Sequence, residues 1–143
     1  DAADPIGINV FAGNDKATIV TDTGVISDDV LRRIDDTTLL VLEANYDPHM
    51  LRFGPYQPFL KQRVASDEGH LSNEMAAQAL LMMKRPDFMQ VILAHRSENN
   101  NNAVLVTQTI GKMLVDGGVR IGPEMKLQHG QPNEIVSIQS VER

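Results

Sequence analysis

Two short segments of the chain are apolar at nearly every position. They read TLLVLE at residues 38–43 and QVILA at residues 90–94. A strand with one face in water alternates apolar and polar residues, whereas a strand buried on both faces is apolar throughout. Both segments are therefore predicted to be central strands of a sheet that needs a cover on each face.

The remaining pattern predicts short strands and helices around this sheet. Two β-rich segments, 6–12 and 16–21, flank the cluster Gly13-Asn14-Asp15, which is typical of a hairpin between antiparallel strands. Ser27 and Ser72 stand where a side chain can cap a helix. Helices are predicted at about 28–34, in two pieces between 48 and 65, at 73–84 and at 101–115, and strands at about 121–128 and 134–139.

The predicted connections leave one face of the sheet without a cover. Helices that follow Ser27, Ser72 and Asn102 are placed most simply on the same side. Large exposed sheet faces are rare on monomers. We therefore expect a single domain over residues 1–143, an α/β fold with a mixed sheet and helices on one face. The other face is expected to meet either a preceding half of the same protein or a second copy of this chain.

The composition excludes several classes of protein. The chain has 143 residues, with 13 Lys and Arg against 19 Asp and Glu and a formal charge of −6. This balance disfavours broad wrapping of nucleic acid, but it leaves room for a local phosphate pocket lined by metal ions. Aromatic residues make up only 4%, which disfavours a base-stacking platform. No apolar run approaches ~18 residues, so no membrane span or membrane partner is expected.

The chain contains no cysteine. Disulfides, thiolate metal sites and thiol nucleophiles are therefore excluded, and any metal must be held by histidine and carboxylate. The lack of cysteine also fits a reducing compartment, and we expect a cytoplasmic protein.

Three polar residues lie where predicted strands or turns end. Asp22 follows the strand KATIVT, His95 follows QVILA, and His70 lies just before the capped helix at 73–84. Ligands and catalytic groups collect at strand ends because the strands fix the side chains there. Each residue also has a purely structural explanation: Asp22 as a turn former, His95 as a buried hydrogen-bonded histidine and His70 as a residue of a helix start.

Four longer strings resemble one known family. IVTDTG, LEANYDPHMLRFGPY, KQRVASDEGHLSNEMAA and ILAHRSENNN occur in this order. They are similar to the C-terminal half of a metallo-β-lactamase-fold hydrolase of the YycJ/WalJ-type branch, which is related to ribonuclease Z and the β-CASP nucleases. The resemblance implies that this chain is one αβ half of an αββα sandwich, and that a longer protein contains it.

The resemblance also implies roles for individual residues. Asp22 matches an aspartate that bridges two divalent metal ions, and His95 matches the last metal-binding histidine. His70 matches a histidine that faces the phosphate and can donate a proton to the leaving oxygen. Apart from the resemblance, Ser72 and Asn73 stand at the start of a helix whose free N–H groups can help to hold a phosphate, although helix capping is their simpler role.

The segment before the first predicted short helix departs from the family pattern. Related sequences often read Asn-His-Asp where this chain has Asn45-Tyr46-Asp47, so no histidine role applies there. Asn45 and Asp47 either support the site or form a turn. The basic residues Arg52, Lys61 and Arg63 either line a phosphate path or are solvated helix charges.

The family's main metal motif, His-x-His-x-Asp-His, does not occur in this chain. The resemblance places it in an N-terminal half. With Asp22 and His95 as its only ligands, the isolated chain is expected to bind few or no metal ions and to be inactive.

The expected parent is an enzyme with two divalent ions, Zn or Mn, that hydrolyses phosphodiesters as an exonuclease does, with nucleic acid as its substrate. The alternatives are thioester or lactam hydrolysis on the same fold, and a non-catalytic half-fold that assembles through its sheet face.

Overall fold

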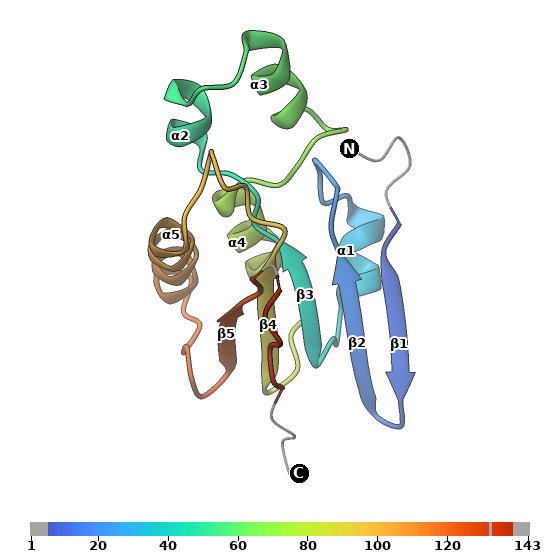
Figure 1. The fold of residues 1–143 in the computed structure, drawn as a ribbon. Helices are drawn as coiled ribbons and strands as arrows, with labels where there is room; N and C mark the ends of the chain where they lie inside the picture. Colours follow the sequence, from blue (N-terminus) through green and yellow to red (C-terminus); the bar gives the residue numbers. More distant parts are fainter. Residues whose placement is uncertain (1–5, 132, 139–143) are drawn as a thin grey trace.

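The computed structural model describes residues 6–131 and 133–138, and these form one mixed sheet with helices. The strands lie side by side in chain order (Figure 1). β1 and β2 pair antiparallel as the predicted hairpin, and every other neighbouring pair is parallel. The α/β fold and the hairpin are thus confirmed. The strands are β1 (Ile8–Ala12), β2 (Asp15–Val20), β3 (Leu39–Glu43), β4 (Met89–Ala94) and β5 (Met125–His129).

The helices begin where the sequence places their caps. The Ser27, Ser72 and Asn102 side chains each accept a hydrogen bond from a backbone N–H in the first turn. Two short helices occupy the segment after residue 47, as predicted. The helices are α1 (Asp28–Ile34), α2 (Pro48–Phe53), α3 (Pro58–Val64), α4 (Asn73–Met82) and α5 (Ala103–Asp116). None of those in the described part of the chain has the length and apolar character needed to cross a membrane.

One main core lies between the sheet and three of the helices. α1, α4 and α5 all cover the same face of the sheet, as predicted (Figure 1). α2 and α3 pack on a separate small cluster and project beyond the carboxyl ends of the parallel strands. The main core contains Val20, Ile34, Leu40, Leu42, Ala76, Leu80, Val91, Leu93, Val106, Ile110 and Leu114.

Among residues 6–131 and 133–138, the opposite face of the sheet is only partly covered. Strand register places Ile8, Ile19, Val41 and Ile92 in one row across this face. Ile8 and Ile19 are 51% and 41% exposed, whereas Ile92 is 8% exposed. Residues 133–138 lie along the β4 and β5 side of this face (Figure 1). The predicted uncovered face is therefore found over β1 and β2, while the C-terminal segment covers part of β4.

The last predicted strand, at 134–139, is wrong over its described part. Residues 134–138 form no strand, and Gln139 lies outside the described residues. The β-branched residues Ile135, Val136 and Ile138 favour a strand, but this described segment crosses a sheet face and does not join an edge (Figure 1). The Gln128 side chain does donate a hydrogen bond to the Ser137 carbonyl (3.3 Å). The preceding strand begins at Met125 and not at about 121, because Gly122 forms a turn at a φ of 98°.

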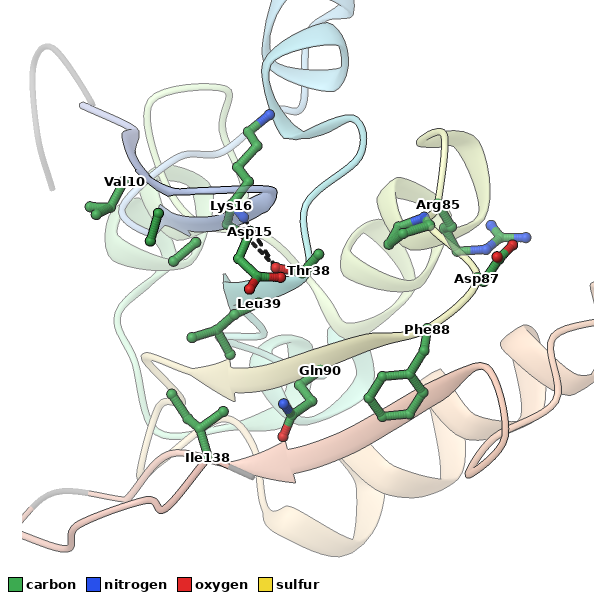
Figure 2. A pocket seen from close by; sticks show the side chains of 13 residues that line it. Val10, Asp15, Lys16, Thr38, Leu39, Arg85, Asp87, Phe88, Gln90 and Ile138 are labelled. Carbon is green, nitrogen blue, oxygen red and sulfur yellow. Dashed lines mark hydrogen bonds between the residues drawn. The ribbon is translucent and has the colours of Figure 1, made fainter. Parts of the chain in front are cut away.

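A hollow on this face lies at the end of the sheet opposite to the carboxyl ends of the parallel strands. It has a volume of about 830 Å³ and surrounds the starts of β2, β3 and β4 (Figure 2). Val10, Leu39 and Ile138 supply apolar walls, and Gln90 lies at its floor. The hollow is thus part of the uncovered sheet face.

Candidate active site

Asp22 and His95 lie just beyond the ends of two parallel-running strands. Asp22 follows β2 and His95 follows β4, with β3 between them, so both side chains reach the carboxyl edge of the sheet. Both residues have positive φ, 58° and 52°, a region that non-glycine residues rarely adopt. Backbone strain of this kind persists where surrounding contacts hold it, and it is common at functional sites.

His70 reaches the same edge from the loop between α3 and α4. Its backbone N–H donates to the Val64 carbonyl (2.9 Å), which ties the loop to the end of α3. The preceding Gly69 permits this contact, because a Cβ atom there would lie 2.2 Å from the Arg63 carbonyl oxygen. His70 is buried, with 8% of its surface exposed.

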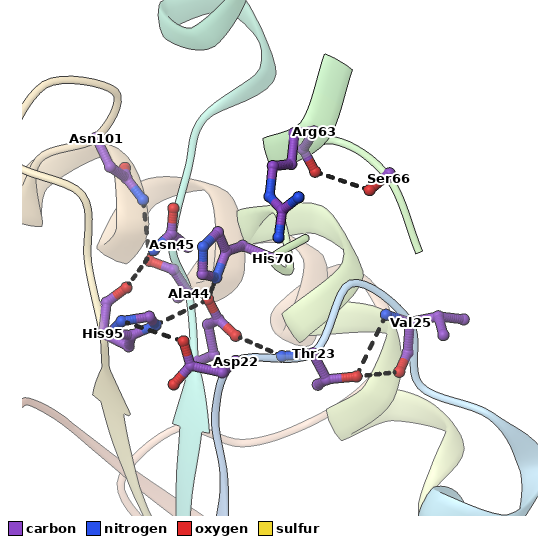
Figure 3. Close-up of polar contacts among 11 residues, drawn as sticks. Asp22, Thr23, Val25, Ala44, Asn45, Arg63, Ser66, His70, His95 and Asn101 are labelled. Atoms are coloured by element: carbon purple, nitrogen blue, oxygen red, sulfur yellow. Dashed lines mark hydrogen bonds and ion pairs between the residues drawn. The ribbon is translucent and has the colours of Figure 1, made fainter. Parts of the chain in front are cut away.

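The structure brings Asp22, His70 and His95 together. One potential ligand atom from each lies within 4.8 Å of the others. The His95 Nε2 atom is 3.7 Å from Asp22 Oδ1, and the two imidazole rings meet edge to face with centroids 5.1 Å apart. Figure 3 shows the three side chains converging from separate segments. The sequence pattern places each of them at a strand or loop end, and the fold makes these ends one site.

Glu43, the last residue of β3, lies behind this site, and the sequence reading assigns it no role. It is completely buried. Its Oε1 atom is 2.6 Å from His70 Nδ1 and 3.0 Å from His95 Nδ1, and its Oε2 atom accepts the Thr23 backbone N–H (3.2 Å). The available signal was a lone acidic residue at the end of an otherwise apolar strand.

The electrostatics of Glu43 fix the proton positions on both histidines. Burial alone would raise the pKa of Glu43, but the hydrogen bonds and positive charges of His70 and His95 outweigh it, and the pKa is lowered. The hydrogen bond to Glu43 in turn raises the pKa of His95. An ionised carboxylate only accepts hydrogen bonds. Both Nδ1 atoms therefore donate to Glu43, and the Nε2 atom of His95 lies on the Asp22 side of its ring.

Asn45 and Asp47 have different positions. The Asn45 side chain donates to the His95 carbonyl (2.7 Å) and holds the residue at positive φ. Asp47 caps α2 by accepting the Met50 N–H (2.8 Å). Asn45 is thus in contact with a candidate ligand, whereas Asp47 serves the adjoining helix.

Ser72 and Asn73 are both buried at the start of α4. Ser72 caps the helix through the Met75 N–H (3.2 Å). The Asn73 and Asn101 side chains bond each other, and Asn101 also donates to the Ala44 carbonyl (3.1 Å). This pair joins α4 to the end of β3, directly next to Glu43.

Gly24 allows the Asp22 loop to touch the loop that carries His70. A Cβ atom at Gly24 would lie 2.0 Å from the Ser66 carbonyl oxygen. Gly24→Ala is therefore expected to lower the free energy of unfolding by about 1–3 kcal/mol, because the backbone of one of the two loops must shift to make room for the methyl group. Thermal denaturation measures this change. Gly111→Ala, within α5, is the matched control, because the nearest atom to its Cβ would lie 3.8 Å away. This variant should raise the free energy of unfolding by about 0.5–1 kcal/mol. Equal stability of the two variants would contradict the close approach.

Comparison with known proteins gives two informative relatives. No family model matches the chain. The chain is 33% identical over 141 residues to an exodeoxyribonuclease YycJ of Bacillus anthracis, an alignment that covers 99% of the chain and 53% of that relative. It is 34% identical over 124 residues to an exodeoxyribonuclease WalJ of Streptococcus pneumoniae, covering 86% of the chain and 46% of that relative. The chain belongs to the YycJ/WalJ family. The resemblance read from the four sequence strings is thereby confirmed.

The YycJ/WalJ relationship also bears on the architecture. The sheet and its one-sided helices fit one αβ half of a metallo-β-lactamase fold. The chain spans about half the length of the curated YycJ/WalJ relatives it matches. These relatives therefore contain about as many residues again that have no counterpart in this chain.

Proposed function

We propose that this chain supplies one side of a dinuclear metal site in a longer protein that hydrolyses phosphodiester bonds, in the manner of an exodeoxyribonuclease. The observation that carries the proposal is the convergence of Asp22, His70 and His95 within 4.8 Å. The names of the YycJ and WalJ relatives support a nuclease. A protonatable histidine beside the ligands favours phosphate over the alternative thioester or lactam substrates.

The residues present fit a divalent metal. The His95 Nδ1 atom donates to Glu43, so Nε2 is the ligand atom, and it faces Asp22. Metal-binding histidines are commonly held in this way by a carboxylate. Imidazole and carboxylate ligands suit Zn and Mn. In our proposal Asp22 and His95 would hold the ions, which when bound would supply activation of water and stabilisation of negative charge on the phosphate.

His70 has the position of a proton donor in this proposal. Its Nδ1–H is held by Glu43 at 2.6 Å, which fixes the orientation of the ring. The protonated ring can then donate from Nε2 to the departing oxygen. Burial of His70 and Glu43 restricts access by bulk water and keeps this geometry fixed.

The ligand set within this chain is incomplete. Asp22 and His95 are two ligands, whereas a tight site for even one zinc ion usually takes three or four protein ligands. We propose that the remaining ligands come from an N-terminal half that packs on the uncovered sheet face. This arrangement would bury the apolar row on β1 and β2 and complete the sandwich.

The packing of the two halves can be tested at Ile19, which is 41% exposed in the middle of the uncovered face. Ile19→Glu is expected to weaken binding of the chain to a separately expressed N-terminal half by at least tenfold, because a charge would be buried. Val115→Glu is the control, since Val115 is 58% exposed on α5. Calorimetric titration measures both. Equal affinities of the two variants for the N-terminal half would contradict this interface. If the chain instead forms a concentration-dependent dimer that only Ile19→Glu disrupts, the sheet face binds a second copy of the chain.

Degradation of DNA by the longer protein tests the proposed function. A linear, end-labelled DNA should be shortened in the presence of Mn or Zn, and chelation followed by metal return should abolish and restore the activity. Asp22→Asn is expected to remove it, since the shared anion is lost. Hydrolysis of thioester or lactam substrates, with DNA and other phosphodiesters left intact, would overturn the proposal.

A further inference from the structure

The α2–α3 segment has a charge opposite to that of the rest of the chain. Residues 48–66 contain three basic residues, Arg52, Lys61 and Arg63, and no acidic residue. The other residues carry 10 Lys and Arg against 19 Asp and Glu. A local basic segment on an acidic protein is the electrostatic mark of an anionic ligand.

The same segment concentrates the aromatic residues of the chain. The whole chain has four Phe and two Tyr, and three of these six lie between residues 53 and 59. Phe53 and Phe59 are 67% and 71% exposed, because the small core beneath α2 and α3 is built from Leu51, Val64 and neighbouring residues instead. The overall aromatic content disfavours a stacking surface, but this local clustering provides one.

The exposed rings and the cations are arranged together. The Arg52 guanidinium lies 5.4 Å from the centroid of the Phe53 ring. The His49 and Phe53 ring centroids are 4.6 Å apart, with the two ring planes tilted by 49°. The Lys61 ammonium donates to the Arg52 carbonyl (2.8 Å), which links the two helices. A surface of cations and accessible aromatic faces binds a strand whose phosphates and unstacked bases are both available.

The segment also adjoins the candidate active site. The His70 N–H bonds the Val64 carbonyl at the end of α3, and α2 and α3 stand beyond the strand ends that carry Asp22 and His95 (Figure 1). The Arg63 side chain extends from α3 beside His70 (Figure 3). A strand lying on α2 and α3 would therefore lead directly to the site.

We propose that the α2–α3 surface, formed by Arg52, Phe53, Phe59, Lys61 and Arg63, binds the single-stranded part of a nucleic acid next to the bond that is cleaved. This inference rests on the proposed function, whose substrate it specifies as a strand with unpaired bases. Bases stacked within a duplex would not have free faces for the two phenyl rings.

Binding of a fluorescein-labelled 20-nucleotide oligothymidylate, measured by anisotropy in EDTA, tests the aromatic contacts. The Phe53→Ala/Phe59→Ala double variant of the longer protein is expected to bind at least tenfold more weakly, since each stacked base contributes about fivefold or more. Phe11→Ala is the matched control, because Phe11 is 70% exposed on β1 with the Lys16 ammonium 5.8 Å from its ring centroid. It should bind within twofold of the unmodified protein.

The salt dependence of the same binding tests the charges. Lys61→Gln should flatten the slope of log affinity against log salt by about 0.7, the value for one lost phosphate contact on a single strand. Lys112→Gln, on α5 and paired with Asp116, should leave the slope unchanged.

Several outcomes would overturn this inference. One is that the oligothymidylate does not bind, and another is that the double variant binds it with unchanged affinity. A double variant that loses affinity for the N-terminal half, and not for the oligothymidylate, would also overturn it. Because the assay contains no metal, its failure is separate from that of the proposed function, which would show as absent phosphodiester cleavage.

Discussion

Replacing His70 by alanine in the longer protein is expected to lower the rate of DNA cleavage about 10²–10⁴-fold, the usual contribution of general acid catalysis. The reason is the position of its ring: Glu43 holds Nδ1 at 2.6 Å, and the ring lies beside Asp22 and His95. The loss should depend on the leaving group. A nitrophenyl phosphodiester, whose leaving group departs without a proton, should be cleaved at nearly the original rate, and steady-state kinetics on both substrates measures the difference.

A second histidine provides the control for this experiment. His129 is partly buried and bonded to Thr107, outside the converging group, so His129→Ala should cleave both substrates within twofold of the unmodified protein. An equal loss on both substrates in His70→Ala would argue that His70 binds metal or supports the fold and does not donate a proton. Full activity on DNA would exclude any part for it in the reaction.

Glu43→Leu is expected to lower the free energy of unfolding by about 3 kcal/mol. Removing one partner of a buried ion pair typically costs 3–5 kcal/mol, and we expect the lower end because the His95 side chain is 41% exposed to water. The midpoint of thermal unfolding should fall by about 10 °C. Glu43→Gln keeps an acceptor for one imidazole and should lose about 1–3 kcal/mol. Equal stability of the leucine variant and the unmodified protein would contradict the structural role of this carboxylate.

The pH dependence of the Glu43 contribution follows from two shifts of opposite sign. The pKa of His95 is raised above its ordinary 6.5, so its contribution is complete below 6.5 and is lost as pH rises through the raised value. The pKa of Glu43 is lowered below 4.5, so its contribution is complete above 4.5 and is lost as pH falls through the lowered value.

In metal-free protein, the stability difference between the unmodified chain and Glu43→Gln should therefore be greatest between about pH 4.5 and 6.5. NMR titration of the imidazoles should show the His95 pKa falling toward its ordinary value in the glutamine variant. A stability difference that stays the same as the pH falls well below 4.5 and rises well above 6.5 would contradict the coupling.

The parts of the fold set by local sequence were predictable. The Gly13-Asn14-Asp15 cluster indicated the hairpin, and the serines that cap α1 and α4 marked their starts, because these signals act over a few residues. The apolar runs indicated β3 and β4 for a similar reason. The predicted strand at 134–139 was wrong over residues 134–138, because this segment crosses the sheet face and does not join an edge, which no short-range pattern reveals.

The site was predictable only in part. Asp22, His70 and His95 each stand at a recognisable strand or loop end, so their types and places suggested function. Glu43 was missed because its role depends on His70 and His95, which are 27 and 52 residues away in the chain. Asn101 is a similar case: within a run of four asparagines only the fold shows that its side chain joins the end of β3 to Asn73.

The metal content of the longer protein tests the central claim most directly, since the claim is that Asp22 and His95 complete a site begun by another part of the protein. Elemental analysis after gel filtration should find about two divalent ions per molecule in the unmodified protein, fewer in Asp22→Ala and His95→Ala, and few or none in the 143-residue chain alone. Full metal content in the Asp22→Ala and His95→Ala variants, or tight stoichiometric metal in the chain alone, would contradict the account.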